Sequence, residues 1–203
     1  MIRRALFASI LALAVAGGAS AQKIPAPKPE LNAAKLPAGE YKLDKTHASV
    51  TLKLAHMGLS HYTLRFTGID AALTFDAAHP VASKLDVTID PKSIDTHDAK
   101  FDEEIATQFL DADKHPTIKF VAKSAKLTGK TTGEVVGDLT FHGVTKPQTL
   151  KVTFNGGLKG MRGEQRLGFS ATTVVKRSDF GADKYVALVG DDVTLLIETE
   201  FTK

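Results

Sequence analysis

Alternation of apolar and polar side chains is the main pattern of this chain and predicts β-strands along most of its length. The clearest case is residues 137–154, where two alternating runs meet at Gly143. The apolar positions of the two runs are Leu139, Phe141, Leu150, Val152 and Phe154. Because successive side chains of a strand point to opposite faces, this segment is predicted to be a hairpin with one apolar face.

Further runs with the same period lie on both sides of this hairpin. Each is short, rich in β-branched or aromatic residues, and bounded by Gly, Asp or Pro, as is typical of strands. Their apolar positions are Val50, Leu52 and Leu54; Leu64 and Phe66; Leu73 and Phe75; Leu85, Val87 and Ile89; Ile118 and Phe120; Leu167, Phe169 and Ala171; and Val193, Leu195, Ile197 and Phe201.

One segment departs from this pattern and has the spacing of a helix. Phe101, Ile105 and Phe109 are four residues apart, with acidic residues beside them. This spacing predicts an amphipathic helix from about Asp98 to Leu110, with the three apolar side chains on one stripe. A lone helix in a strand-rich chain is expected to pack that stripe against the sheet.

The number of runs predicts an all-β antiparallel domain. About eight strands can close into a barrel that is either filled by side chains or holds one slender ligand. A two-sheet sandwich fits the same alternation and stays an alternative. Ala122 and Ala171, both in the inward phase, favour an interior with room, although tight packing between strands would also explain small residues there.

The first part of the chain has a different character. Residues 1–21 combine Arg3 and Arg4 with a short apolar run and an Ala-Ser-Ala end, which is the pattern of a cleavable signal peptide. Residues 22–38 contain four of the eight prolines and are expected to be a flexible arm. Residues 39–203 are expected to form one domain.

Composition and charge argue against several classes of function. The chain has no Cys, so it has neither disulfides nor a thiol nucleophile. Removing the two Arg of residues 1–21 from 26 Lys and Arg, against 23 Asp and Glu, leaves a formal net charge of +1. A charge so close to zero gives no support for a nucleic-acid partner.

Several motifs occur in an order typical of a known family. They are residues 41–47, 54–60, 65–68, 89–96, 115–120, 137–145, 168–171, 176–181 and 189–193. Together they resemble the YceI-like proteins, which are periplasmic, lipocalin-like proteins that bind polyisoprenoids. The resemblance implies a lipocalin-like antiparallel β-barrel of about eight strands, with one amphipathic helix packed near its mouth.

The resemblance also implies a function. The implied function is to carry or sequester a polyisoprenoid, namely a polyprenyl lipid or an isoprenoid quinone, in an apolar cavity in the periplasm. The resemblance implies no cofactor. Transient contact with a membrane for loading is part of this hypothesis, and the sequence leaves open a homodimer. The alternatives are a carrier of another amphiphile, such as a fatty acid or fatty amide, and a solid-cored stress or interaction protein without ligand.

Eleven apolar residues of the strands and the helix are predicted to line the cavity and contact the ligand. A core that is simply filled would use the same side chains, so each of them fits both interpretations. They are Leu54, Phe66, Leu85, Val87, Phe101, Ile105, Phe109, Phe120, Phe141, Val152 and Phe169.

Candidate catalytic and metal-binding residues are few. The acidic pairs at 103–104 and 191–192 are adjacent in sequence, so their carboxylates point in different directions on either a strand or a helix. No Gly-x-Ser-x-Gly motif is present. No compact spacing typical of zinc sites occurs among the histidines considered as ligands. These are His47, His56, His61 and His142. We therefore expect neither an enzyme nor a metal site.

Overall fold

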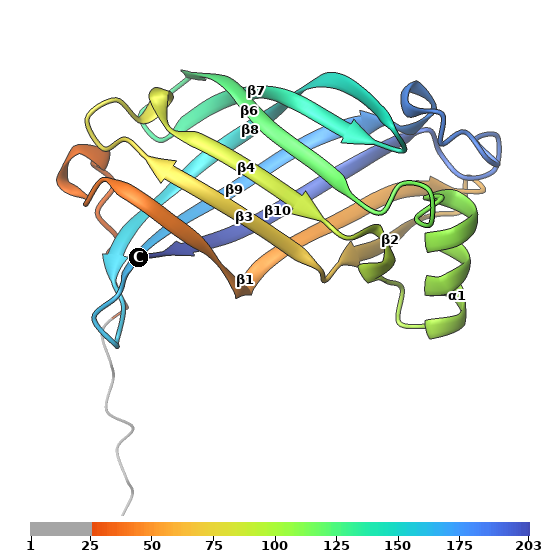
Figure 1. Ribbon diagram of the computed structural model, residues 1–203, viewed down its shortest axis with the longest axis horizontal. Coiled ribbons are helices and arrows are strands. Elements are labelled where there is room, and N and C mark those ends of the chain that lie inside the picture. Colours follow the sequence, from red (N-terminus) through yellow and green to blue (C-terminus); the bar gives the residue numbers. More distant parts are fainter. Residues whose placement is uncertain (1–25) are drawn as a thin grey trace, which may run out of the picture.

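Ten antiparallel strands form one continuous sheet in the computed structural model, which describes residues 26–203 (Figure 1). Eight of them, in the order β10-β9-β8-β7-β6-β4-β3-β1, close into a barrel because β1 also pairs with β10. The predicted barrel is confirmed and the sandwich is not. The strands are β1 Gly39–His56, β2 Ser60–Phe66, β3 Ile69–Phe75, β4 Lys84–Ile89, β5 Ile94–Asp95, β6 Ile118–Leu127, β7 Thr132–Phe141, β8 Val144–Lys159, β9 Gln165–Lys176 and β10 Asp192–Thr202.

Strand β1 changes partner along its length. Its first residues, Gly39 to Lys42, pair with β3, whereas Val50 to His56 pair with β2. Its pairing with β10 is interrupted between Leu43 and Ala48, where the register shifts. Such a bulge bends a strand and increases its twist. Strands β2 and β5 therefore extend the sheet beyond the closed barrel, at the end that also carries the helix (Figure 1).

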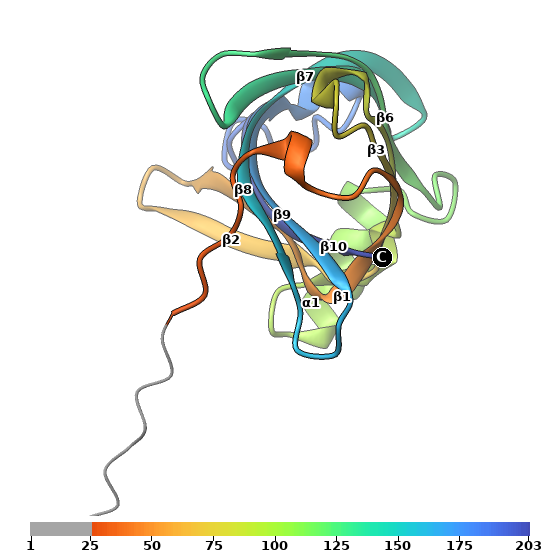
Figure 2. The ribbon, with the colours of Figure 1, turned by 90° about the vertical axis from the view of Figure 1, so that its left-hand side faces the viewer.

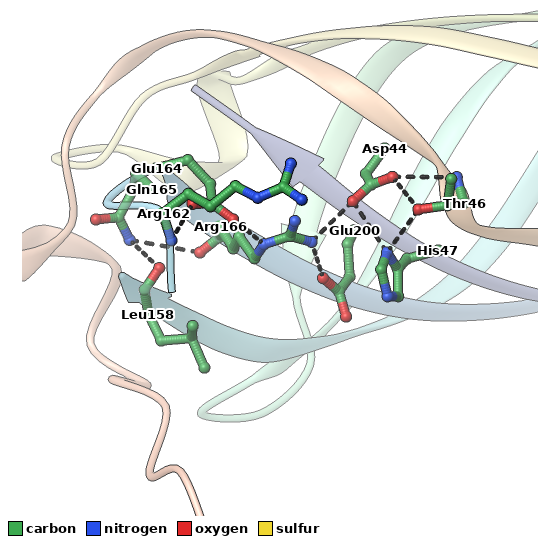
Figure 3. A network of polar contacts seen from close by, with 9 residues as sticks. All are labelled: Asp44, Thr46, His47, Leu158, Arg162, Glu164, Gln165, Arg166 and Glu200. Carbon is green, nitrogen blue, oxygen red and sulfur yellow. Dashed lines mark hydrogen bonds and ion pairs between the residues drawn. The ribbon is translucent and has the colours of Figure 1, made fainter. Parts of the chain in front are cut away.

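A polar network holds this bend in β1 against β9 and β10 (Figure 3). The Arg166 guanidinium donates from Nη1 to Asp44 Oδ2 at 2.8 Å and to Glu200 Oε2 at 2.7 Å. The Thr46 hydroxyl donates to Asp44 Oδ1 at 2.6 Å. Hydrogen bonds that Asp44 accepts from Thr46, Arg166 and His47 hold its pKa well below its ordinary value.

The predicted hairpin at residues 137–154 is confirmed as the junction of β7 and β8. Phe141 pairs with Val144, which leaves His142 and Gly143 as a two-residue turn. Their φ angles are +50° and +76°. Two positive φ values are the signature of the type I′ turn, whose twist matches that of the flanking strands.

The predicted helix is also confirmed, with a change of pitch. It consists of α1 Ala99–Glu104 followed by η4 Ile105–Phe109, a wider π-helical turn. The Asp98 side chain caps its start by accepting from the Lys100 and Phe101 backbone amides. Of the residues that the structure describes, none belongs to a helix long and apolar enough to cross a membrane. The remaining helical turns are η1 Ala33–Lys35, η2 Pro80–Ala82, η3 Pro91–Ser93 and η5 Arg177–Phe180.

The second half of the predicted flexible arm lies against the barrel. Glu30 forms an antiparallel bridge with Gly157, in which both backbone amides donate to the opposite carbonyl. Leu36, which follows η1, is only 8% exposed. A Cβ at position 157 would lie 2.7 Å from Leu36 Cδ1, so Leu36 occupies space that a side chain at this position would need. Residues 1–25, which include the predicted signal peptide, lie outside the described residues.

Candidate functional site

A cavity of about 1380 Å³ runs through the barrel. Ligand pockets are usually about 300–1,000 Å³, so this space is large for a domain of this size. Its lining extends from η1 and the β6–β7 turn at one end to α1 and η4 at the other. Figure 2 looks into the first of these ends, which we call the arm end, and shows η1 across the opening. We call the opposite end the helix end.

The buried apolar side chains form two separate clusters. The larger one lies mainly on β1, β2 and β3, and the smaller contains Phe120, Leu139, Val175 and Phe180. The cavity of about 1380 Å³ is lined by residues of both clusters. Partly buried side chains, including Val87 and Ile118, lie between the two clusters. The interior is therefore hollow, and the alternative of a solid-cored protein does not describe it.

All eleven residues predicted from the sequence face this cavity. They converge from β1, β2, β4, β6, β7, β8, β9 and both parts of the helix, which are far apart along the chain. Their contact with a ligand stays a prediction. The residues are Leu54, Phe66, Leu85, Val87, Phe101, Ile105, Phe109, Phe120, Phe141, Val152 and Phe169.

The helix contributes its apolar stripe to one end of the cavity. Phe101 contacts Tyr62 of β2, with ring centroids 5.9 Å apart in an edge-to-face arrangement. Phe109 contacts Tyr185 at 5.9 Å, and the Lys184 ammonium lies 5.4 Å from the Phe109 ring. Since aromatic pairs and cation–π contacts favour defined geometries, they fix the position of the helix across the helix end.

Further lining residues were not among the predicted ones. Leu150 and Leu195 lie in phase with Val152 and Ile197, so the same alternation could have identified them. Tyr62 is in phase with Leu64 and Phe66. Its strand lies outside the closed barrel, and the sequence gives no sign that such a strand reaches the cavity.

Buried Arg177 is the functional residue that sequence reasoning missed most clearly. It lines the cavity, is 7% exposed, and donates to the four carbonyl oxygens of Ala182, Lys184, Val189 and Gly190 at 2.6–3.0 Å. Burial lowers the pKa of Arg177, but a guanidinium stays charged at neutral pH. A buried charge without a carboxylate partner fixes residues 181–191 through their backbone. Arg177 lies in the motif of residues 176–181, but its role could not be read from the sequence because its partners are backbone carbonyls.

Two other polar groups in the wall are already paired. The Gln148 side-chain amide donates to Thr173 Oγ1 at 2.6 Å, and the Thr173 hydroxyl donates to the Thr149 carbonyl at 2.8 Å. Both Gln148 and Thr173 line the cavity. Because their partners belong to the wall itself, the hydrogen-bonding groups aimed at a ligand are few, and the middle of the cavity favours an apolar occupant.

The candidate histidines and acidic residues from the sequence lie in different parts of the structure. Of the histidines considered, His56 lines the cavity beside Tyr62. His47 and His142 each join a group of potential metal ligands, Asp44–His47–Glu200 and Asp111–His115–His142. No group of three or more potential ligands within residues 26–203 includes His61. Asp191 accepts from the Ser178 hydroxyl at 2.7 Å, and Glu103 and Glu104 are exposed.

The family model described as YceI-like domain matches residues 41–201. The chain belongs to the YceI-like family. A UPF0312 protein of Pseudomonas putida (strain GB-1) is 46% identical to this YceI-like chain over 154 residues, which are 74% of this chain and 80% of the relative.

Solved structures show the same YceI-like fold. A YceI protein of Campylobacter jejuni matches with a TM-score of 0.66 and 32% identity, covering 73% of this chain and 89% of that one. A polyisoprenoid binding domain from Saccharophagus degradans matches with a TM-score of 0.58, covering 79% of this chain and 97% of that one. At 14% identity the second likeness shows the fold alone.

Proposed function

We propose that this YceI-like protein binds the hydrocarbon chain of a polyisoprenoid, either a polyprenyl lipid or an isoprenoid quinone, and shields it from water. The observation that carries the proposal is the hollow interior of about 1380 Å³ with apolar walls on every strand of the barrel. The polyisoprenoid binding domain of Saccharophagus degradans, which shares the fold, supports the same class of ligand.

The chemistry of the wall suits such a ligand. An isoprenoid carries branched methyl groups and offers no hydrogen bonds along its length, so shape and burial must recognise it. Each Å² of apolar surface removed from water contributes about 25 cal/mol. The aromatic side chains Phe66, Phe120, Phe141 and Phe169 provide large contact areas for the methyl groups. Binding rather than catalysis is the role that this lining supports.

Polar groups are concentrated where the cavity meets solvent at the arm end. The lining there includes Lys84, Lys126, Lys130 and Glu134, which surround the opening near η2 and the β6–β7 turn. A polar head group of the lipid would keep its hydration at such an opening, while its tail extends into the apolar middle. This arrangement would favour amphiphiles with one long apolar chain.

Exposed apolar side chains at the helix end would allow contact with a membrane. Leu59 is 84% exposed and Met57 is 58% exposed, both in the β1–β2 turn, and Leu188 of the neighbouring loop is 52% exposed. The Met57 amide donates to the Leu188 carbonyl at 2.7 Å, which joins the two segments. Transient insertion of this apolar edge would bring the protein to a membrane for loading. A periplasmic location, reached through the predicted signal peptide, would place the protein beside two membranes.

Mass spectrometry of an organic extract tests the proposal. The protein is purified without detergent from cells in which it is exported, and its extract is compared with that of a folded control protein. We expect a polyprenyl lipid or isoprenoid quinone close to one per chain. Fatty acids or fatty amides in that proportion would favour the alternative carrier function. An extract without lipid, together with no thermal stabilisation by added polyprenol or quinone, would refute the proposal.

A further inference from the structure

Two histidines and one aspartate from separate segments converge beside the helix end of the barrel. Asp111 and His115 lie in the loop between η4 and β6, and His142 lies in the turn between β7 and β8. Their potential ligand atoms all lie within 4.8 Å of one another. The rings of His115 and His142 have centroids 5.0 Å apart. All three side chains are half-buried, so water and ions can reach them.

One imidazole is oriented by a group that can only accept a hydrogen bond. His142 Nδ1 lies 3.2 Å from the carbonyl oxygen of Phe180. This contact requires the proton on Nδ1, so the lone pair of the neutral ring is on Nε2. Metal-binding histidines commonly have this arrangement, in which an outer carbonyl fixes the ring and its tautomer. This hydrogen bond therefore leaves Nε2 of His142 free to act as a metal ligand.

The backbone is adapted to hold the three side chains together. The amides of Lys114 and His115 both donate to the Asp111 carbonyl, at 3.0 and 2.9 Å, which closes the loop into a tight turn. A Cβ at Gly143 would lie 2.5 Å from His115 Cε1, so the ring occupies space that a side chain at position 143 would need. Asp111 adopts a φ of +46°, which is uncommon for a residue other than glycine.

From this geometry we infer that Asp111, His115 and His142 bind one divalent transition-metal ion of the zinc type. Two imidazoles and a carboxylate are typical ligands of Zn²⁺, at about 2.0–2.2 Å from the metal. Ligand atoms in tetrahedral coordination are then about 3.4 Å apart, so small side-chain rotations would complete the site. A fourth position would stay open to water or to an anionic group. The ion would join the loop after the helix to the β7–β8 turn.

The second group of potential ligands shows what distinguishes this site. In Asp44–His47–Glu200 the Arg166 guanidinium already contacts both carboxylates, at 2.8 and 2.7 Å, and occupies the place of a cation. Asp111 also has a cationic neighbour, Lys114, at 2.8 Å. The Lys114 side chain is 75% exposed, however, so it can move into water when a metal ion binds. The inference therefore concerns only the first group. It departs from the sequence-based expectation of no metal site, which did not consider Asp111 or His115 as ligands.

Titration of the tag-free protein with Zn²⁺, in competition with a chromophoric chelator, tests this inference. We expect one equivalent to bind to the wild type and His142→Asn to bind at least ~10-fold more weakly, because even outer ligands contribute ~10–100-fold. Asparagine tolerates positive φ, so this variant keeps the turn. Asp111→Asn keeps the backbone for the same reason and should show the same loss.

His47→Gln, which alters the second group, is the matched control and should bind Zn²⁺ like the wild type. Thermal melts without metal show whether each variant folds, and if His142→Asn does not, Asp111→Asn and His115→Gln decide the matter. The inference is overturned if the folded wild type binds no Zn²⁺ at micromolar concentrations. It is equally overturned if the folded ligand variants bind as tightly as the wild type, or if His47→Gln abolishes binding.

Discussion

The two ends of the barrel are stabilised by different interactions. At the arm end Leu36, Tyr41 and Leu167 are at most 8% exposed and pack into an apolar core beside the opening of the cavity. At the helix end the guanidinium of Arg177 holds residues 181–191, while several apolar side chains remain in water. These are Met57, Leu59, Tyr185 and Leu188. At each end a segment outside the barrel strands covers part of the sheet: the docked arm at one end, and at the other the helix, where Leu64, Phe66 and Ala106 are buried. Between the two ends the same alternation leaves an apolar wall that lines the cavity.

Truncating one leucine in a packed region and one beside the cavity should give the largest difference in the free energy of unfolding. Leu167 is 0% exposed and packs beside Leu36, whereas Leu150 is only partly buried and faces the cavity. Leu167→Ala should lower the free energy of unfolding by about 3–4 kcal/mol, because it creates a void in a packed core. Leu150→Ala should cost about 1 kcal/mol, because it enlarges an existing hollow. Urea unfolding of the lipid-free proteins measures both values, and equal losses would show that the middle is packed like the arm end.

Removal of the buried guanidinium tests whether polar contacts stabilise the helix end. Arg177→Met leaves four carbonyl oxygens without their donor, and we expect a loss of about 3 kcal/mol together with rapid proteolysis within residues 181–191. Arg162→Met is the matched control, because Arg162 is exposed in the β8–β9 turn and its loss should cost less than about 0.5 kcal/mol. If the two variants were equally stable, the loop would have to be held by apolar packing instead.

Disruption of the polar network at the bend of β1 is expected to have a smaller, pH-dependent effect on the free energy of unfolding. Arg166→Gln should lower stability at pH 7 by about 1 kcal/mol, since the network is partly exposed. The pKa of Asp44 is lower in the folded protein than its ordinary value, so its contacts stabilise the fold above about pH 4. That contribution is lost as the pH falls and Asp44 becomes protonated. The difference between wild type and variant should therefore shrink below about pH 4 in unfolding experiments, and a difference independent of pH would contradict the role of Asp44.

Local patterns in the sequence were sufficient to predict most of the strands, the helix and the cavity faces. The strand period, the spacing of Phe101, Ile105 and Phe109, and the hairpin at 137–154 each depend on residues close in the chain. From these patterns eleven side chains were predicted to face the interior, and all of them line the cavity. Barrel and sandwich could not be separated in this way, because closure depends on the pairing of β1 with β10, which are far apart in sequence.

The features that sequence reasoning missed all depend on contacts between distant segments. Arg177 acts through backbone carbonyls, which have no residue signature. Asp111 and His142 come together only because the helix directs its following loop to the β7–β8 turn. The arm was expected to be flexible because of its prolines, yet Leu36 packs in a space left by Gly157. Each of these depends on shape complementarity that only the assembled barrel creates.

Native mass spectrometry of the intact protein, compared with a variant whose cavity is blocked, tests the central claim most directly. Ala171 lies on β9 between Val152 and Ile197 and faces the cavity, so Ala171→Phe should fill the apolar middle. Val174→Phe on the same strand is the control, because Val174 is 52% exposed. We predict one bound lipid per chain for the wild type and Val174→Phe, and none for Ala171→Phe. Folded wild type without bound lipid, or equal loading of Ala171→Phe, would contradict the account.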